Sequence, residues 1–113
     1  MMEENYSGEQ RRNHYRIKYP LIERPFLTVD KNTYQVLDIS EGGVKFFSPV
    51  KNFKVGEYIT GSIKFHDGEI VTVEGHILRL QSRRIIILLD RKIPLQRILK
   101  EQRHLIKKYA GFR

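Results

Sequence analysis

Three arginines occur within six residues near the start of the chain, in the segment Arg-Arg-Asn-His-Tyr-Arg that covers residues 11–16. A guanidinium is a planar set of N–H donors that stays charged, so Arg11, Arg12 and Arg16 could grip a phosphate with two bonds or stack on a nucleobase. Taken alone, the segment is more typical of a solvent-facing basic stretch. The chain has 21 Lys and Arg residues against 13 Asp and Glu residues, and this net charge of +8 suits an anionic partner in either case.

A second polar group, Asp38, Ser40 and Gly43, lies where one predicted strand ends and the next begins. Two residues that are two apart in a strand can project from the same side. A carboxylate could then accept hydrogen bonds from the ring N–H and the exocyclic amine of a guanine, and the hydroxyl adds a polar contact. Gly43 permits a backbone conformation that other residues resist. Taken alone, this segment is more typical of a polar turn in a β-hairpin.

The other side chains give no pattern for catalysis or metal binding. The chain has no cysteine, which excludes disulfides, thiolate catalysis and cysteine-ligated zinc. The four histidines are scattered without the spacing of metal ligands, and no Ser or Thr lies in the context of a nucleophile elbow or a triad. We therefore expect no enzyme, no cofactor and no metal.

The elements that must position these residues are mostly β. Segments rich in β-branched and aromatic residues, separated by short turn-forming stretches, cover residues 26–29, 33–39, 43–47, 58–65, 70–80 and 84–89. Six strands with short connections and no intervening helix predict a mainly β fold, a six-stranded antiparallel β-barrel that closes its own edges.

After the barrel, the hydrophobic period changes and predicts one amphipathic helix over residues 94–110, with Pro94 in its first turn. We expect its buried face to carry the apolar side chains Leu95, Ile98, Leu99, Leu105, Ile106 and Tyr109, together with Gln102. The opposite face would carry Arg97, Lys100, Arg103, Lys107 and Lys108.

The domain organisation follows from these elements. We expect residues 1–10 to be a disordered leader and residues 11–113 to form one domain, with the barrel at about 19–90. The leader is acidic and lacks the apolar run of a signal peptide. The longest apolar run, residues 85–89, is far shorter than the roughly 20 residues of a membrane helix. We expect no membrane span and a cytoplasmic protein.

Together, the two polar groups resemble the two-part signature of the PilZ family. The first part is Arg12-x-x-x-Arg16, and the second is Asp38-x-Ser40-x-x-Gly43. The β-rich stretch and the C-terminal helix agree with this resemblance, which covers about residues 11–90. It implies a PilZ-like split barrel, and a single-domain receptor for the bacterial second messenger cyclic di-GMP.

The resemblance also implies a role for each motif residue. Arg12 and Arg16 would reach the Hoogsteen edges of the guanines and the phosphates. Asp38 and Ser40 would contact guanine from the barrel surface, and Gly43 would keep the turn open for the ligand.

Three further positions are weaker candidates for the same site. Arg11 holds a position that in this family is often tied to the number of bound ligand molecules. Gly42 lies beside the second motif. Arg79 lies in the segment Gly75-His76-Ile77-Leu78-Arg79, which resembles a family strand near the binding face.

The function implied by the resemblance is sensing without catalysis. Ligand binding would order the Arg-rich N-terminal segment into a new face, which an effector protein not identified by the sequence would recognise. One alternative is a small basic barrel that binds nucleic acid, which the net charge and the aromatic residues support, whereas the acidic acceptor at Asp38 argues against it. The other is a PilZ adaptor that binds only protein, against which the intact motif residues argue.

Overall fold

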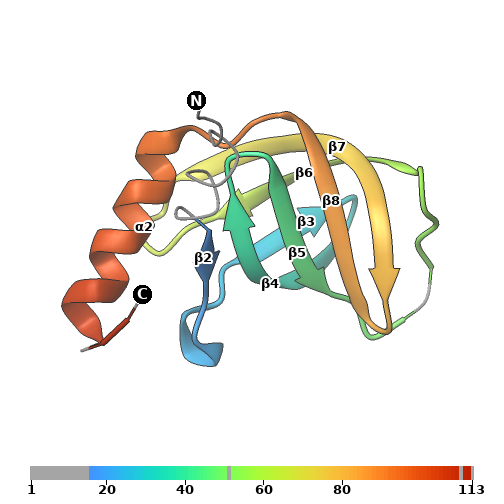
Figure 1. Cartoon of the computed structure of the whole chain (residues 1–113). Helices are drawn as coiled ribbons and strands as arrows, with labels where there is room; N and C mark the ends of the chain where they lie inside the picture. The colour runs from blue at the N-terminus through green and yellow to red at the C-terminus, as the bar shows by residue number, and fades with distance from the viewer. Residues whose placement is uncertain (1–15, 51, 110, 113) are drawn as a thin grey trace, which may run out of the picture.

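The computed structural model describes residues 16–50, 52–109 and 111–112. The predicted leader, residues 1–10, and the motif arginines Arg11 and Arg12 lie outside this part of the chain. The described residues form strands β2 (Ile17–Lys18), β3 (Phe26–Val29), β4 (Asn32–Ser40), β5 (Gly43–Phe47), β6 (Tyr58–Lys64), β7 (Ile70–Gln81) and β8 (Arg84–Arg91), the 3-10 helix η1 (Leu21–Glu23) and the α-helix α2 (Leu95–Lys108) (Figure 1).

The strands form a closed barrel. Hydrogen bonding runs in the order β4-β3-β6-β7-β8-β5, and β5 pairs again with β4, so the sheet returns to its start through antiparallel neighbours. Closure leaves no open edge among these strands. The predicted six-stranded antiparallel barrel with a C-terminal helix is therefore confirmed.

One short strand outside the barrel was not predicted. β2 pairs with β4 through Ile17–Ile39 and Lys18–Asp38, whereas β3 pairs with the first part of β4, from Asn32 to Gln35. β5 takes the other edge of β4, so β2 and β3 follow one another along a single edge. The chain before the barrel is thereby held against β4, close to the second motif.

A β-bulge in β4 decides which way the motif residues point. Val36 pairs with Phe46, but Asp38 pairs with the next residue of β5, so Leu37 is an extra residue without a partner there. Val36 and Ile39 are both fully buried in the core. In a regular strand Asp38 would face inward like Val36, and the bulge instead turns its side chain to the outer surface.

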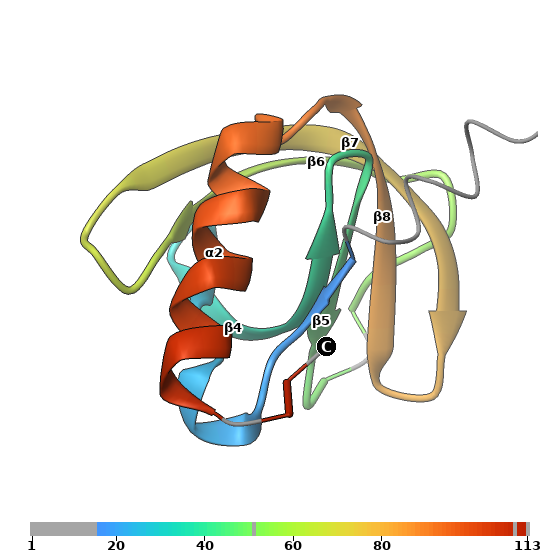
Figure 2. The ribbon, with the colours of Figure 1, turned by 60° about the vertical axis from the view of Figure 1, so that its left-hand side comes forward.

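Apolar side chains from every strand of the barrel fill its interior, as the alternation predicts. The most deeply buried members are Leu27, Val36, Ile39, Val44, Phe46, Ile63, Val73, Ile77 and Ile87. The helix α2 adds Ile98 and Leu105 to the same cluster. Figures 1 and 2 show α2 along one side of the barrel, with β2 beside it.

The predicted buried face of α2 is wrong in part. Ile98 and Leu105 are buried as expected, whereas Leu95 and Ile106 are exposed. Two charged residues, Arg97 and Glu101, take their place in the interface. A buried charge is costly unless it is paired, so these two need partners from the barrel.

Those partners come from distant segments of the chain. The Arg97 guanidinium donates to Glu101 at 2.6 Å and to the carboxylates of Asp67 and Glu69, which lie in and beside the β6–β7 turn. The Tyr19 hydroxyl donates to the second oxygen of Glu101 at 2.6 Å. Burial, followed by the Glu101 carboxylate, raises the pKa of Tyr19 far above its ordinary value, so the hydroxyl remains a neutral donor. This network pairs the charge of Arg97, which the periodicity assigns to solvent, with the buried carboxylate of Glu101.

With 14 residues and many charges, the α-helix of the described residues is neither long nor apolar enough to cross a membrane.

Candidate ligand-binding site

The second motif lies on a turn that the rest of the barrel fixes. Two residues, Glu41 and Gly42, join β4 to β5. The carbonyl of Gly42 accepts a hydrogen bond from the backbone N–H of Leu89, and the carbonyl of Glu41 accepts one from Ile93, both at 2.9 Å. The turn is therefore tied to the end of β8 and to the segment that enters α2.

Asp38 is the centre of the site. Its Oδ1 accepts a hydrogen bond from Nη1 of Arg16 at 2.9 Å, and its Oδ2 lies 3.5 Å from Nζ of Lys45. Lys18 pairs with Asp38 across the β2–β4 ladder. Although Asp38 points to the outer face of the barrel, its side chain is buried beneath these neighbours. The carboxylate of Asp38 thus pairs with two cations, and a third cationic residue lies opposite it in the ladder.

Ser40 projects from the same face as Asp38, because no bulge separates them. Its partner across the hairpin is Gly43. A Cβ at Gly43 would lie 3.6 Å from the Ser40 hydroxyl and 3.4 Å from the carbonyl oxygen of Ile87. The absent side chain thus leaves space beside the Ser40 hydroxyl.

The expected conformational reason for Gly43 is wrong. Positive φ angles among the glycines of the described residues occur at Gly56, Gly68 and Gly111, and neither Gly42 nor Gly43 is among them. A Cβ at Gly42 would meet no atom within 4 Å. Gly43 therefore matters for the space that it leaves rather than for a left-handed backbone.

The register extends the site across the outer face of the barrel. Cross-strand partners form one row through Lys18, Asp38, Lys45, Ile86 and Arg79. Arg79 is exposed in this row, but it lies three strands from Asp38, at roughly 14 Å for ordinary strand spacing. The neighbouring row places the exposed side chain of Leu88 beside Gly43.

The structure therefore brings together Arg16, Asp38, Ser40 and Gly43, and it leaves Arg79 at the rim. Sequence reasoning missed Lys18, Lys45 and Leu88. A signal for Lys45 was present, because a two-residue loop that pairs Ser40 with Gly43 also sets Asp38 opposite Lys45. Leu88 could not be found this way, since its position depends on the pairing of β8 with β5.

The site is suited to an anionic, planar ligand. Arg16, Lys18 and Lys45 can neutralise phosphates, and the exposed Leu88 offers an apolar surface for a flat ring. Within the described ranges, no group of three or more His, Asp or Glu side chains is arranged to hold a metal ion.

Comparison with known proteins gives one match. The family model described as PilZ domain matches residues 10–110, which is nearly the whole chain. No curated protein and no solved structure matches the chain.

Proposed function

The chain belongs to the PilZ domain family, and from this premise we propose that it binds cyclic di-GMP through Arg16, Asp38, Ser40 and Gly43. PilZ domains generally bind this dinucleotide, and they are binding or adaptor domains rather than enzymes. Arg11 and Arg12 belong to the proposed site through the family resemblance, with Gly42 and Arg79 at its edge.

The observation that carries the proposal is the contact between Arg16 and Asp38. These residues belong to the two halves of the motif, 22 positions apart, and their side chains meet at 2.9 Å. A basic stretch that faced only solvent would not place one of its guanidinium groups against a buried carboxylate. The contact supports a single site assembled from both halves.

In the proposed complex, the arginines bind the phosphates and Asp38 accepts from guanine. An ionised carboxylate offers about four lone-pair sites, so Asp38 has acceptor capacity beyond its bond to Arg16. The guanine N1–H and amine match this capacity, whereas adenine lacks that pair of donors. A hydroxyl from Ser40 and the open space at Gly43 complete the proposed base contact.

We further propose that a partner protein reads the bound state. Arg16 directly precedes β2, and Tyr19, which follows β2, donates to Glu101 of α2. A ligand that pulls on Arg16 would therefore act on a segment anchored at its other end to the helix. This connection supports an output that reaches beyond the ligand site.

Isothermal titration calorimetry with cyclic di-GMP, cyclic di-AMP, GTP and a short oligonucleotide tests the binding step. We expect a dissociation constant for cyclic di-GMP of about 1 μM or tighter, roughly 8 kcal/mol, and much weaker binding of the other three. Arg16→Ala should cost about 1.5–3 kcal/mol, because it removes charge-assisted hydrogen bonds. Arg103→Ala changes an exposed arginine on α2 and serves as the matched control.

Equal affinity for the two cyclic dinucleotides would contradict the role of Asp38. Unchanged affinity in Arg16→Ala would contradict the site. Tighter binding of the oligonucleotide would favour a nucleic-acid-binding barrel, and no binding of any nucleotide would favour an adaptor that binds only protein.

A further inference from the structure

The 3-10 helix η1 presents its apolar residues to solvent. Leu21 is 70% exposed and Ile22 is 83% exposed, and none of the three residues of η1 is buried. Single exposed apolar residues are ordinary, but two adjacent aliphatic side chains on a segment with no buried face need another explanation.

The position of η1 is fixed by its polar residue instead. Oε2 of Glu23 accepts from Lys108 at 2.7 Å and from the Tyr109 hydroxyl at 2.8 Å, and Oε1 lies 3.2 Å from Nε2 of His104. All three partners lie at the end of α2. Because these bonds hold η1 against the helix, its aliphatic side chains are not needed for the fold and remain available for another surface.

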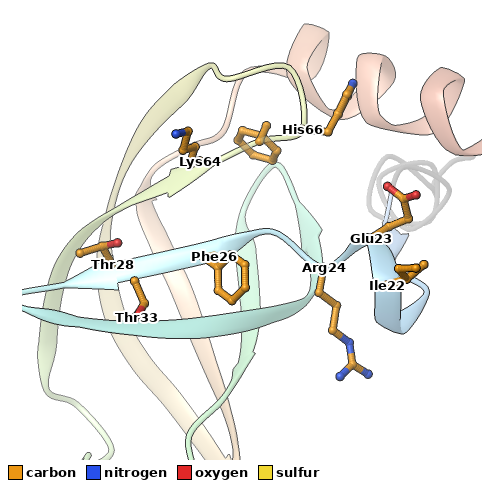
Figure 3. Close-up of a pocket in the computed structure, with 9 residues that line it drawn as sticks. Ile22, Glu23, Arg24, Phe26, Thr28, Thr33, Lys64 and His66 are labelled. Atoms are coloured by element: carbon orange, nitrogen blue, oxygen red, sulfur yellow. The ribbon is translucent and has the colours of Figure 1, made fainter.

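Beside η1 lies a groove of about 570 Å³ on the outside of the barrel (Figure 3). Its apolar lining includes Ile22 and Phe26, and Phe26 is 53% exposed. Phe26 and Lys64 are cross-strand partners on β3 and β6, and Arg24 reaches out on the other side of Phe26. The groove thus places an exposed aromatic ring between two cations.

The charges in this groove are unbalanced. Its one acidic lining residue is Glu23, whose carboxylate is already engaged by α2. Among the described residues, Lys64 forms no ion pair, and Arg24 donates only to the neutral amide of Gln35 at 3.2 Å. The Nε of Arg24 is buried and lacks a hydrogen-bond partner there. An arriving carboxylate would find two cations without a countercharge.

We propose that this groove docks a partner protein through a segment that carries a large apolar side chain next to carboxylates. The apolar side chain would cover Ile22 and Phe26, and the carboxylates would pair with Lys64 and Arg24. The inference extends the partner step of the proposed function. Its test uses no cyclic di-GMP, so either proposal can fail while the other stands.

Selection of a random dodecapeptide library displayed on phage against the full chain tests the groove. We expect the enriched peptides to combine Leu, Ile or Phe with Asp or Glu. A fluorescein-labelled synthetic peptide of the enriched sequence should then bind in an anisotropy titration. Ile22→Ser and Lys64→Glu should each weaken its binding about tenfold or more, as expected for residues at the centre of an interface.

The controls separate docking from folding and from net charge. Ile22 and Lys64 are exposed, so circular dichroism should show both variants folded. Lys54→Glu makes the same charge change outside the groove and should leave the affinity unchanged. The proposal is wrong if no peptide is enriched, if the enriched peptides lack carboxylates, or if both groove variants bind the peptide as tightly as the unmodified chain.

Discussion

The guanidinium of Arg16 and the carboxylate of Asp38 form a 2.9 Å ion pair whose two partners differ sharply in exposure. The side chain of Arg16 is 40% exposed, whereas that of Asp38 is 6% exposed. Asp38 is therefore the more fixed partner, and Arg16 is the more accessible one. In the proposed complex, Asp38 would position Arg16 and would accept from guanine once Arg16 turns to the ligand.

A double-mutant cycle measures the coupling free energy between Asp38 and Arg16 in ligand binding. We expect Arg16→Ala and Asp38→Ala each to weaken cyclic di-GMP binding in calorimetry. The double variant should lose less than the sum of the two, by about 1 kcal/mol or more, because residues in one ion pair are coupled. Arg103→Ala combined with Asp38→Ala is the control and should be additive. Additivity in the Arg16–Asp38 cycle would show that the two residues act separately.

Substitutions at two glycines, Gly43 and Gly75, separate a role in ligand binding from a role in packing of the barrel. An added Cβ at Gly43 would meet its nearest atoms at 3.4 and 3.6 Å, whereas one at Gly75 would collide with the carbonyl oxygen of Leu88. Gly43→Ala should therefore keep the free energy of unfolding in urea but reduce affinity for cyclic di-GMP several-fold, since the methyl group would occupy the space beside Ser40 that the ligand is proposed to use. Gly75→Ala should lower the free energy of unfolding by about 1–3 kcal/mol. The reverse pattern would remove Gly43 from the site.

Arg11 bears on the number of bound ligands. Cyclic di-GMP carries two guanines that can stack on those of a second molecule, and a further guanidinium can cover the exposed face of such a stack. We therefore predict two ligand molecules per chain in calorimetry, and one in Arg11→Leu. Arg103→Leu should still bind two. Saturation of the unmodified chain at one ligand would contradict the prediction.

Glu23 should make stability depend on pH in the acid range. The hydrogen bond from Lys108, followed by those from Tyr109 and His104, lowers the pKa of Glu23 from 4.5 to about 2. A lowered pKa means that ionised Glu23 stabilises the fold above pH 4.5, and that this contribution is lost as the pH falls toward 2. Urea unfolding should find Glu23→Gln less stable by about 1–2 kcal/mol at pH 7, with the difference shrinking below pH 4.5.

The control for that measurement is Glu41→Gln, since the Glu41 side chain forms no hydrogen bond or ion pair among the described residues. Its stability relative to the unmodified chain should be the same at all pH values. A constant difference for Glu23→Gln down to pH 2 would mean that the ionised carboxylate is not what anchors η1.

The barrel strands could be predicted because each is rich in β-branched and aromatic residues and is bounded by turn-forming stretches. β3 and β5 begin and end at the predicted residues. β2 could not be predicted, because a strand of two residues exists only through its pairing with β4. The helix face was misjudged for a related reason. Periodicity assigns charges to solvent, and only the folded chain brings Asp67 and Tyr19 to the buried charges of α2.

The motif spacing singled out Asp38 and Ser40 as candidates, but the sequence did not reveal why they face outward. Alternation from the buried Val36 would have placed Asp38 inside. The groove beside η1 left no signal either, because it combines Ile22 with Phe26 and Lys64 from two different strands. Surfaces built from separate segments depend on tertiary pairing, which a single sequence does not show directly.

The extra residue at Leu37 reverses the alternation of side chains between the two faces of β4. Beyond it, Asp38 and Ser40 point to the outside of the barrel and Ile39 points to the inside. Deleting Leu37 would set Asp38 directly after Val36, so regular alternation alone would then keep Asp38 outside and Ile39 inside. With Leu37 present, only the bulge achieves this. A barrel that received Asp-x-Ser two positions after an inward side chain would need the same bulge to keep the motif on its surface.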